Sequence, residues 1–216
     1  MFTGIIQELG TVTRVERTQG LVRLSVAAPK IASKVQRLDS VAVNGVCLSV
    51  VSVRQQLIGF EVIRETQALT TLSGLRRGHR VNLEPSLGVC DRLSGHLVFG
   101  HVDGIGRIAA RRQLAGELVL EVQVETGLRR WVVPKGPVAI DGISLTVGRA
   151  LRALSFTVHV IPETLRLTTL GQLGVGARVN VEIDYFAKLL WQFVREGTRR
   201  HPVPRPGRLV GSPEPL

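Results

Sequence analysis

The chain carries one sequence pattern twice, and this duplication constrains its fold more than any other feature. Four segments recur in the same order, each at an offset of roughly 97 residues. The pairs are GIIQELG from Gly4 and GHVDGIG from Gly100, VAVNGVCLSV from Val41 and VAIDGISLTV from Val138, ETQALTTL from Glu65 and ETLRLTTL from Glu163, and VNLE from Val81 and VNVE from Val179. A fixed period of this length indicates two tandem domains of one fold. We expect these domains over residues 1–95 and 96–184, followed by segments 185–196 and 197–216 that have no counterpart in the repeat.

The composition is that of a globular protein. Hydrophobic residues make up 44% of the chain and charged residues 21%, and no apolar run reaches the roughly 18 residues that a membrane span needs. The first residues, MFTGIIQELG, lack the basic start of a secretory signal, so we expect a cytoplasmic protein. Cys47 and Cys90 form no CxxC pair and have no histidine cluster beside them, so both are expected to be free thiols with no metal site.

The formal net charge of +11 is the one compositional feature that suggests nucleic acid. Several arginines, however, lie in a Pro/Gly-rich tail over residues 197–216 that we expect to be disordered. Acids and bases alternate within the repeats, and the 4% of aromatic residues is too few for a set of side chains that stack on bases. We therefore expect neither nucleic acid nor a membrane as a partner.

Short β-branched runs bounded by Gly, Asn, Asp or Pro predict strands in both copies. They lie at residues 41–53, 58–63, 80–84, 117–124, 137–147, 154–161 and 178–183. No long helical period alternates with them, which favours an all-β barrel or sandwich over a parallel sheet. Residues 66–75 and 164–173 have short helical spacing, and only residues 185–196 predict a full amphipathic helix. Its stripe of Phe186, Leu189, Leu190 and Phe193 is expected to pair with copies of itself, because the duplicated domains should fill their own cores.

Five motifs in register across the chain resemble the riboflavin synthase family: MFTGII, AVNGVCLSV, SGHLVFGHVDGIG, KGPVAIDGISLTV and IPETLRLTTL. The resemblance implies two tandem six-stranded antiparallel Greek-key barrels and a C-terminal helix, assembled as a homotrimer with the site between barrels of neighbouring subunits. It also implies a transferase without cofactor or metal, which converts two molecules of 6,7-dimethyl-8-ribityllumazine into riboflavin and 5-amino-6-(D-ribitylamino)uracil by moving a four-carbon unit. Association with a lumazine synthase is compatible with it. A reaction between two copies of one substrate needs two similar pockets, and a duplicated barrel supplies them.

The family motifs, together with the places where the two copies differ, select the catalytic candidates. They are Cys47, His101, Ser144, Thr146, Asp184 and Ser40. The resemblance implies that Cys47 contacts the acceptor lumazine near C7 and that His101 moves the proton of the donor's methyl group near neutral pH. Ser144 and Thr146, two apart in a strand, should present both hydroxyls to one face and hold the donor. Each candidate has an ordinary alternative: Cys47 as a small buried hydrophobe, His101 as a surface group, Asp184 as a helix N-cap.

Substrate contacts are expected from matching segments of the two copies. In the first copy they are Phe2, Gly4, Ile5, Ile6, Cys47, Leu48, Ser49, Glu61, Val62, Ile63, Arg64, Glu65 and Thr66. In the second they are Gly100, His101, Val102, Lys135, Ser144, Leu145, Thr146, Val158, His159, Val160, Ile161, Pro162 and Glu163. Phe2 is expected to act as a lid, and His96 to lie on the strand face opposite His101. Phe99 and Ser94 differ from the family pattern and should alter the local shape of the pocket.

Two other functions remain open at this point. Lumazine-binding antenna proteins use the same duplicated barrel to hold a chromophore without converting it, but the catalytic candidates retained here favour the enzyme. A basic nucleic-acid-binding barrel is suggested by the net charge alone.

Overall fold

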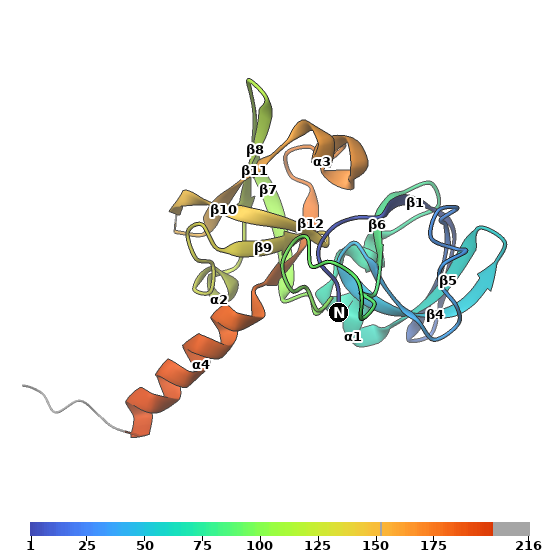
Figure 1. Cartoon of the computed structure of the whole chain (residues 1–216), viewed down its shortest axis with the longest axis horizontal. Coiled ribbons are helices and arrows are strands. Elements are labelled where there is room, and N and C mark those ends of the chain that lie inside the picture. The colour runs from blue at the N-terminus through green and yellow to red at the C-terminus, as the bar shows by residue number, and fades with distance from the viewer. Residues whose placement is uncertain (152, 201–216) are drawn as a thin grey trace, which may run out of the picture.

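The computed structural model describes residues 1–151 and 153–200, and this part of the chain forms two closed six-stranded antiparallel barrels (Figure 1). The strands of barrel 1 are β1 (Glu8–Thr18), β2 (Leu21–Ala27), β3 (Ser40–Val43), β4 (Val46–Arg54), β5 (Leu57–Ile63) and β6 (Arg80–Pro85). Those of barrel 2 are β7 (Gly104–Leu114), β8 (Glu117–Gln123), β9 (Pro137–Ile140), β10 (Ile143–Leu151), β11 (Ser155–Val160) and β12 (Arg178–Ile183). Both barrels have the same strand order, β1-β2-β5-β4-β3-β6 in the first, so the Greek-key prediction is confirmed.

Helices occupy the connections and the C-terminal part of the described chain. They are α1 (Arg64–Leu69), η1 (Thr71–Gly74), α2 (Thr126–Arg129), α3 (Pro162–Leu167), η2 (Thr169–Gly171) and α4 (Tyr185–Arg200). The short helical segments predicted at 66–75 and 164–173 each divide into an α and a 3-10 turn, beginning two residues earlier than expected. Helix α4 continues past residue 196, and the part of the predicted tail from residue 201 lies outside the described residues.

The single strands predicted at 41–53 and 137–147 are each interrupted by a tight turn. Each divides into a hairpin, because Asn44-Gly45 and Asp141-Gly142 have φ values of 46° and 77°, and of 46° and 78°. Positive φ at both central positions is the requirement of a type I′ turn, which Asn-Gly and Asp-Gly meet with little strain. The strands β1, β2 and β7 were not predicted, since charged residues interrupt their apolar alternation on the solvent side.

Each barrel has its own core. Val12, Leu24 and Phe60 belong to the cluster inside barrel 1, and Leu120 and Phe156 to the cluster inside barrel 2. Burial of such side chains, worth about 1.5–3 kcal/mol each, is the main stabilising contribution in both halves. The expectation that each copy fills its own core is confirmed.

The two barrels meet around a reciprocal set of hydrogen bonds. The side-chain amide of Asn82 donates to the Asp141 carbonyl (2.9 Å), and that of Asn180 donates to the Asn44 carbonyl (2.8 Å). The turns also touch each other, since a Cβ on Gly45 would lie 2.5 Å from the Gly142 nitrogen. The contact therefore repeats the internal symmetry of the sequence, with corresponding residues bonding across it.

Helix α4 projects away from barrel 2 and is fixed to it at one end (Figure 1). The Lys188 ammonium donates to both carboxylate oxygens of Asp103, at 2.8 and 2.9 Å. The Arg130 guanidinium lies 4.5 Å from the Trp131 ring and 4.6 Å from the Trp191 ring, so it is held between them.

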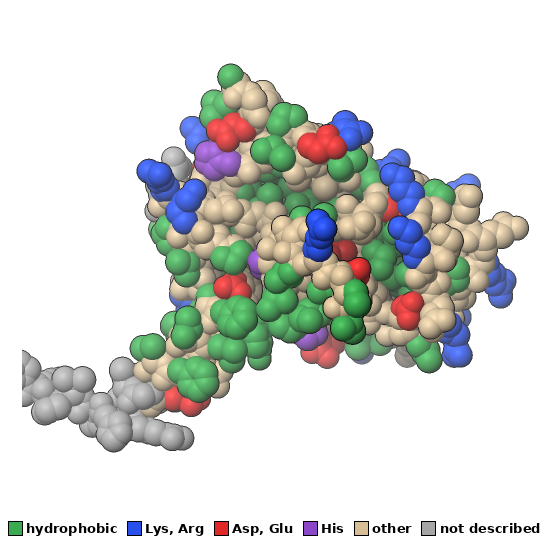
Figure 2. All heavy atoms as spheres, viewed as in Figure 1, with side chains coloured by type: hydrophobic (Ala, Val, Ile, Leu, Met, Phe, Trp, Pro, Cys, Tyr) green, Lys and Arg blue, Asp and Glu red, His purple; other side chains and the backbone are tan. Residues whose placement is uncertain are grey.

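The opposite side of α4 is apolar and exposed. Phe186, Leu190, Phe193 and Val194 are all more than half exposed, and Figure 2 shows hydrophobic side chains along the projecting helix. Leu189, predicted within the same stripe, is partly buried instead.

Candidate functional site

The segment that precedes the first strand of each barrel lies against the other barrel. We call residues 2–6 the first arm and residues 98–102 the second arm. The Ser144 nitrogen in β10 donates to the carbonyl of Gly4 (2.8 Å), and the Cys47 nitrogen in β4 donates to the carbonyl of Gly100 (3.0 Å). Ile6 packs against the core of barrel 2, and Val102 packs against that of barrel 1. The arms are thus exchanged: the first arm lies beside the candidates of the second half of the sequence, and the second arm beside those of the first half.

Close approach at both arms requires glycine. Gly4 and Gly100 have φ of 77° and 75°. A Cβ on Gly4 would lie 2.6 Å from Cβ of Ser144, and a Cβ on Gly100 would lie 2.6 Å from Cβ of Cys47. Each arm thus contacts the strand that carries the main catalytic candidate of the opposite barrel.

Barrel 2 carries a pocket of about 670 Å³, a size typical of small-molecule sites. Its wall includes Lys135, Ser144, Thr146, His159, Ile161 and Thr164. Ser144 and Thr146 both line it. The pocket offers three hydroxyls, a lysine ammonium and an imidazole beside an apolar side chain, which suits a polar heterocycle with carbonyl and ring-nitrogen acceptors.

His96, which is not among the candidates selected from the sequence, contacts one of them, Ser144. Its Nδ1 lies 2.7 Å from the Ser144 hydroxyl oxygen, and its backbone nitrogen donates to Thr3 in the first arm (3.1 Å). Burial lowers the pKa of His96, and the charge of Asp184 opposes this shift. The imidazole is therefore mainly neutral at pH 7 and can exchange a proton with the Ser144 hydroxyl.

The prediction that His96 and His101 occupy opposite faces of a strand is wrong. Their segment contains a single isolated bridge, between Phe2 and Val98, and is otherwise irregular. His101 is exposed on the second arm, with its ring 6.1 Å from that of Phe99. The two histidines have different environments, as expected. The difference arises because His101 lies on the second arm, and not because the two side chains alternate along a strand.

In barrel 1, Cys47 is half-buried beside a small cluster of Phe2, Ala42, Val98 and Ala139. Phe2 is completely buried there, so it is a packing residue between the arms and not a lid. Ser49 is exposed and pairs across the ladder with Ser40 in β3. Cys47, Ser49 and Ser40 thus lie together, in the place that corresponds to the barrel 2 pocket.

Several predicted contact residues have side chains inside the barrel cores. Leu48, Val62, Val158 and Val160 are buried in the barrel cores, so only their backbone atoms are available. Other predicted contacts are partly engaged: Glu61 accepts from Arg23 (2.9 Å) and His159 lies 3.0 Å from Glu117. Glu163 bonds Arg166 in α3. Exposed residues of the remaining set are Ile5, Ile63, Arg64, Glu65, Ile161 and Pro162.

Asp184 caps α4, as one of the two interpretations expected. Its carboxylate accepts from the Phe186 nitrogen at 3.2 Å, and its charge still acts on His96. Lys135 occupies a turn with φ of 63° at the edge of the barrel 2 pocket. Both residues therefore have structural roles at positions from which they also influence the site.

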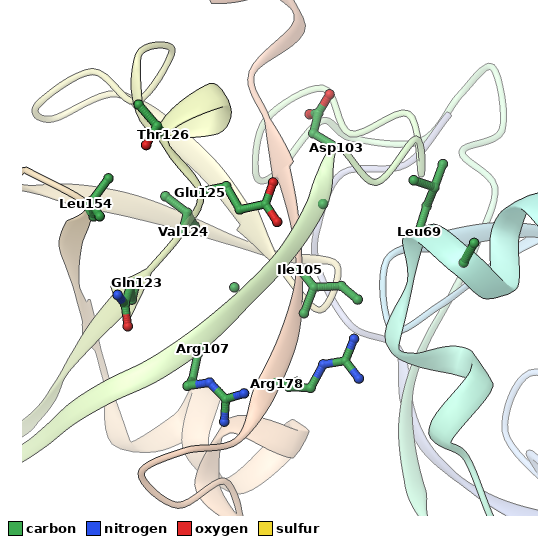
Figure 3. A pocket seen from close by; sticks show the side chains of 13 residues that line it. Leu69, Asp103, Ile105, Arg107, Gln123, Val124, Glu125, Thr126, Leu154 and Arg178 are labelled. Atoms are coloured by element: carbon green, nitrogen blue, oxygen red, sulfur yellow. The ribbon is translucent and has the colours of Figure 1, made fainter.

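A separate hollow of about 720 Å³ lies between α1 and barrel 2 (Figure 3). Asp103, Glu125, Arg107 and Arg178 border it, and none of the predicted site residues does. Asp103 is already bound by Lys188. The lining of the hollow includes one hydroxyl, that of Thr126, and no imidazole, so we do not assign the chemistry to it.

In residues 1–151 and 153–200, no group of three or more His, Cys, Asp or Glu is placed to hold a metal ion. Within the same residues, no helix has the length and apolar character needed to cross a membrane.

The fold and the site define a duplicated β-barrel protein with chemically related residues at matching places in both barrels. The sequence profile of the lumazine binding domain matches residues 3–86 and again residues 99–184. The chain is 42% identical to a riboflavin synthase of Mycobacterium bovis over 198 residues, covering 90% of this chain and 98% of that protein. It is 37% identical to one from Bacillus amyloliquefaciens over 196 residues, covering 91% of each. The chain belongs to the riboflavin synthase family, which confirms the resemblance of its motifs.

Solved structures agree on the fold. Crystal structures of LumP with riboflavin and with 6,7-dimethyl-8-(1'-D-ribityl) lumazine superpose with TM-scores of 0.79 and 0.76. Their sequence identities are 23% and 24%, and each match covers 85% of this chain and 99% of LumP. At this identity the likeness supports the barrel architecture alone.

Proposed function

We propose that the protein is a riboflavin synthase that joins two molecules of 6,7-dimethyl-8-ribityllumazine, transferring a four-carbon unit from one to the other. The observation that carries this proposal is the exchange of arms, which builds matching sites around Ser144 and Cys47 from both halves of the chain. Two copies of one substrate require two similar sites that differ at the reacting atoms. Serine in one site and cysteine in the other is such a difference.

In this proposal the barrel 2 pocket holds the donor. The hydroxyls of Ser144 and Thr146 and the ammonium of Lys135 bind its carbonyl and ring-nitrogen acceptors. The 7-methyl group of a lumazine is acidic because the ring delocalises the resulting anion, so a modest base is sufficient. His96, with its lowered pKa and its contact to Ser144, can accept that proton. His101 lies beside Cys47 in barrel 1, so it can do so only from the acceptor site of a neighbouring subunit that faces this donor site.

Barrel 1 then holds the acceptor, with the Cys47 thiol directed to the electrophilic C7 of its ring. Holding two heterocycles in a reactive orientation supplies up to roughly 7–11 kcal/mol of the barrier, so much of the catalysis lies in positioning. Metal and cofactor are not required by this scheme, because the four-carbon unit and the protons move between the two substrate molecules.

We further propose a homotrimer built on the exposed apolar side of α4, in which the acceptor site of one subunit faces the donor site of another. The exposure of Phe186, Leu190 and Phe193 supports it, since a monomer rarely leaves such a row in water. Removing residues 185–216 should reduce the mass measured by light scattering to that of one chain. An unchanged mass would exclude α4 as the interface.

Incubation with 6,7-dimethyl-8-ribityllumazine tests the function. The expected result is the appearance of riboflavin absorbance together with the pyrimidinedione product. A lumazine that binds without being converted would instead indicate a chromophore-binding protein, the second candidate, of which the lumazine complex of LumP is an example on the same fold. Salt-sensitive retention of oligonucleotides without either result would indicate a basic nucleic-acid-binding barrel.

A further inference from the structure

Two carboxylates lie buried at corresponding places in the last strand of each barrel. They are Glu84 in β6 and Glu182 in β12, with exposed fractions of 4% and 5%. Neither belongs to the candidate catalytic or binding set. A buried carboxylate is costly unless it receives hydrogen bonds, so the partners of these two groups indicate their role.

Both carboxylates bind the backbone of the adjoining arm. Glu84 accepts from the Thr3 nitrogen (2.7 Å), the Thr3 hydroxyl (2.8 Å) and the Gly4 nitrogen (3.0 Å). Glu182 accepts from the Phe99 nitrogen (2.7 Å) and the Gly100 nitrogen (2.9 Å). In each case the two oxygens of one carboxylate receive two successive amides, which fixes both the position and the direction of the arm.

The same arm residues continue the chain of hydrogen bonds into the opposite barrel. The carbonyl of Gly4 accepts from the Ser144 nitrogen, and the carbonyl of Thr3 accepts from the His96 nitrogen. The carbonyl of Gly100 accepts from the Cys47 nitrogen, and His101 is the next residue of that arm. Each glutamate is therefore linked, through one arm residue, to the backbone of a candidate site in the opposite barrel.

We propose that Glu84 and Glu182 are positioning residues that act across the barrels: Glu84 sets the Ser144–His96 site of barrel 2, and Glu182 sets the Cys47–His101 site of barrel 1. This rests on the proposed function only for the identity of the ligand. Because the arms are exchanged, each glutamate controls the pocket of the barrel to which it does not belong. A glutamate with a merely structural role would affect its own barrel first.

Two matched variants, Glu84→Gln and Glu182→Gln, test the proposal, and each serves as the control for the other. Glutamine keeps the volume but offers one acceptor oxygen, so one of the two arm amides loses its partner. Hydrogen exchange measured on peptides should be about tenfold faster at Thr3, Gly4 and Ser144 in Glu84→Gln. The amides of Phe99, Gly100 and Cys47 should keep the wild-type rate, and Glu182→Gln should give the reverse pattern.

Titration with 6,7-dimethyl-8-ribityllumazine measures the ligand affinity of each pocket in the same variants. Each single variant should weaken one of two binding events about tenfold and leave the other unchanged, and the double variant should weaken both. Glu16→Gln, which changes an exposed partner of Arg14, is the surface control and should behave as wild type. Equal loss at both pockets in both variants, or faster exchange confined to the variant's own barrel, would overturn the proposal.

Two further measurements keep the test decisive. If Glu84→Gln does not fold, Thr3→Val removes the hydroxyl that donates to Glu84 and accepts from the Ile5 nitrogen, but keeps both arm amides on Glu84, and it should produce a smaller shift at Ser144. Unchanged exchange at Ser144 in that variant would count against the proposal. If the wild-type protein binds no lumazine, the proposed function fails, while the exchange pattern still decides whether the glutamates act across the barrels.

Discussion

Replacing Asp141 with asparagine should remove a pH-dependent loss of stability. Asp141 lies in the turn where the barrels meet, and burial raises the pKa of its carboxyl from the ordinary 3.8 to about 7. The bond from the Asn180 nitrogen (2.8 Å) acts in the opposite direction. Because the folded pKa lies above the unfolded value, the contribution of this group is complete below about pH 4 and is lost as pH rises through 7.

The size of the effect follows from the shift. At about 1.4 kcal/mol for each pKa unit, a shift of about three units corresponds to roughly 4 kcal/mol, of which about 2–3 kcal/mol is lost between pH 5 and pH 8. Asparagine should fit without strain, because Asn44 occupies the corresponding turn with the same φ of 46°. The Asn44 side-chain oxygen accepts from the Asn82 nitrogen at 2.7 Å.

Urea unfolding followed by circular dichroism at several pH values between 5 and 8 measures the effect. The free energy of unfolding of Asp141→Asn should exceed that of the wild type by a margin that grows by about 2–3 kcal/mol over this range. The reverse change, Asn44→Asp, should introduce a similar pH dependence into the other turn. A constant difference between Asp141→Asn and wild type at every pH would refute the reasoning.

Three other changes test separate parts of the structure. Cys47→Ser should fold normally and lower the turnover of dimethylribityllumazine at least about tenfold in steady-state assays, and wild-type turnover would remove the thiol from the mechanism. Gly45→Ala, at φ of 77° and facing Gly142, should lower the free energy of unfolding by about 1–3 kcal/mol or more in urea titrations. Lys188→Met should leave the mostly buried Asp103 carboxylate without its cation, with the Ile183 amide still donating to it, and cost roughly 1–3 kcal/mol, seen as a lower thermal midpoint.

The sequence predicts the fold well where local chemistry and repetition agree. The strand at 178–183 has the predicted bounds, and the apolar side of α4 is exposed as expected. The Asn44-Gly45 and Asp141-Gly142 pairs carried a hairpin signal that a continuous β-branched run concealed. The sequence therefore predicts a single strand over residues 41–53, where the structure has β3 and β4.

The exchange of arms could not be predicted from the sequence. A repeat shows that Gly4 corresponds to Gly100, but the local sequence is the same whether each arm serves its own barrel or the other. His96 was missed for the same reason, since it approaches Ser144 only after the first arm has crossed. The family motifs identified most residues around the barrel 2 pocket. Deciding which barrel each candidate residue serves required the three-dimensional arrangement.

The connection between the barrels has a consequence for what holds the molecule together. Around Val89, which is fully exposed, a protease could cut the chain into two unequal pieces. The pieces would remain one particle, because the first still extends its arm to Ser144 and the second still extends its arm to Cys47. The peptide bond between the barrels ensures that the two halves are synthesised in equal amounts and associate immediately. It is not needed to hold the folded halves together.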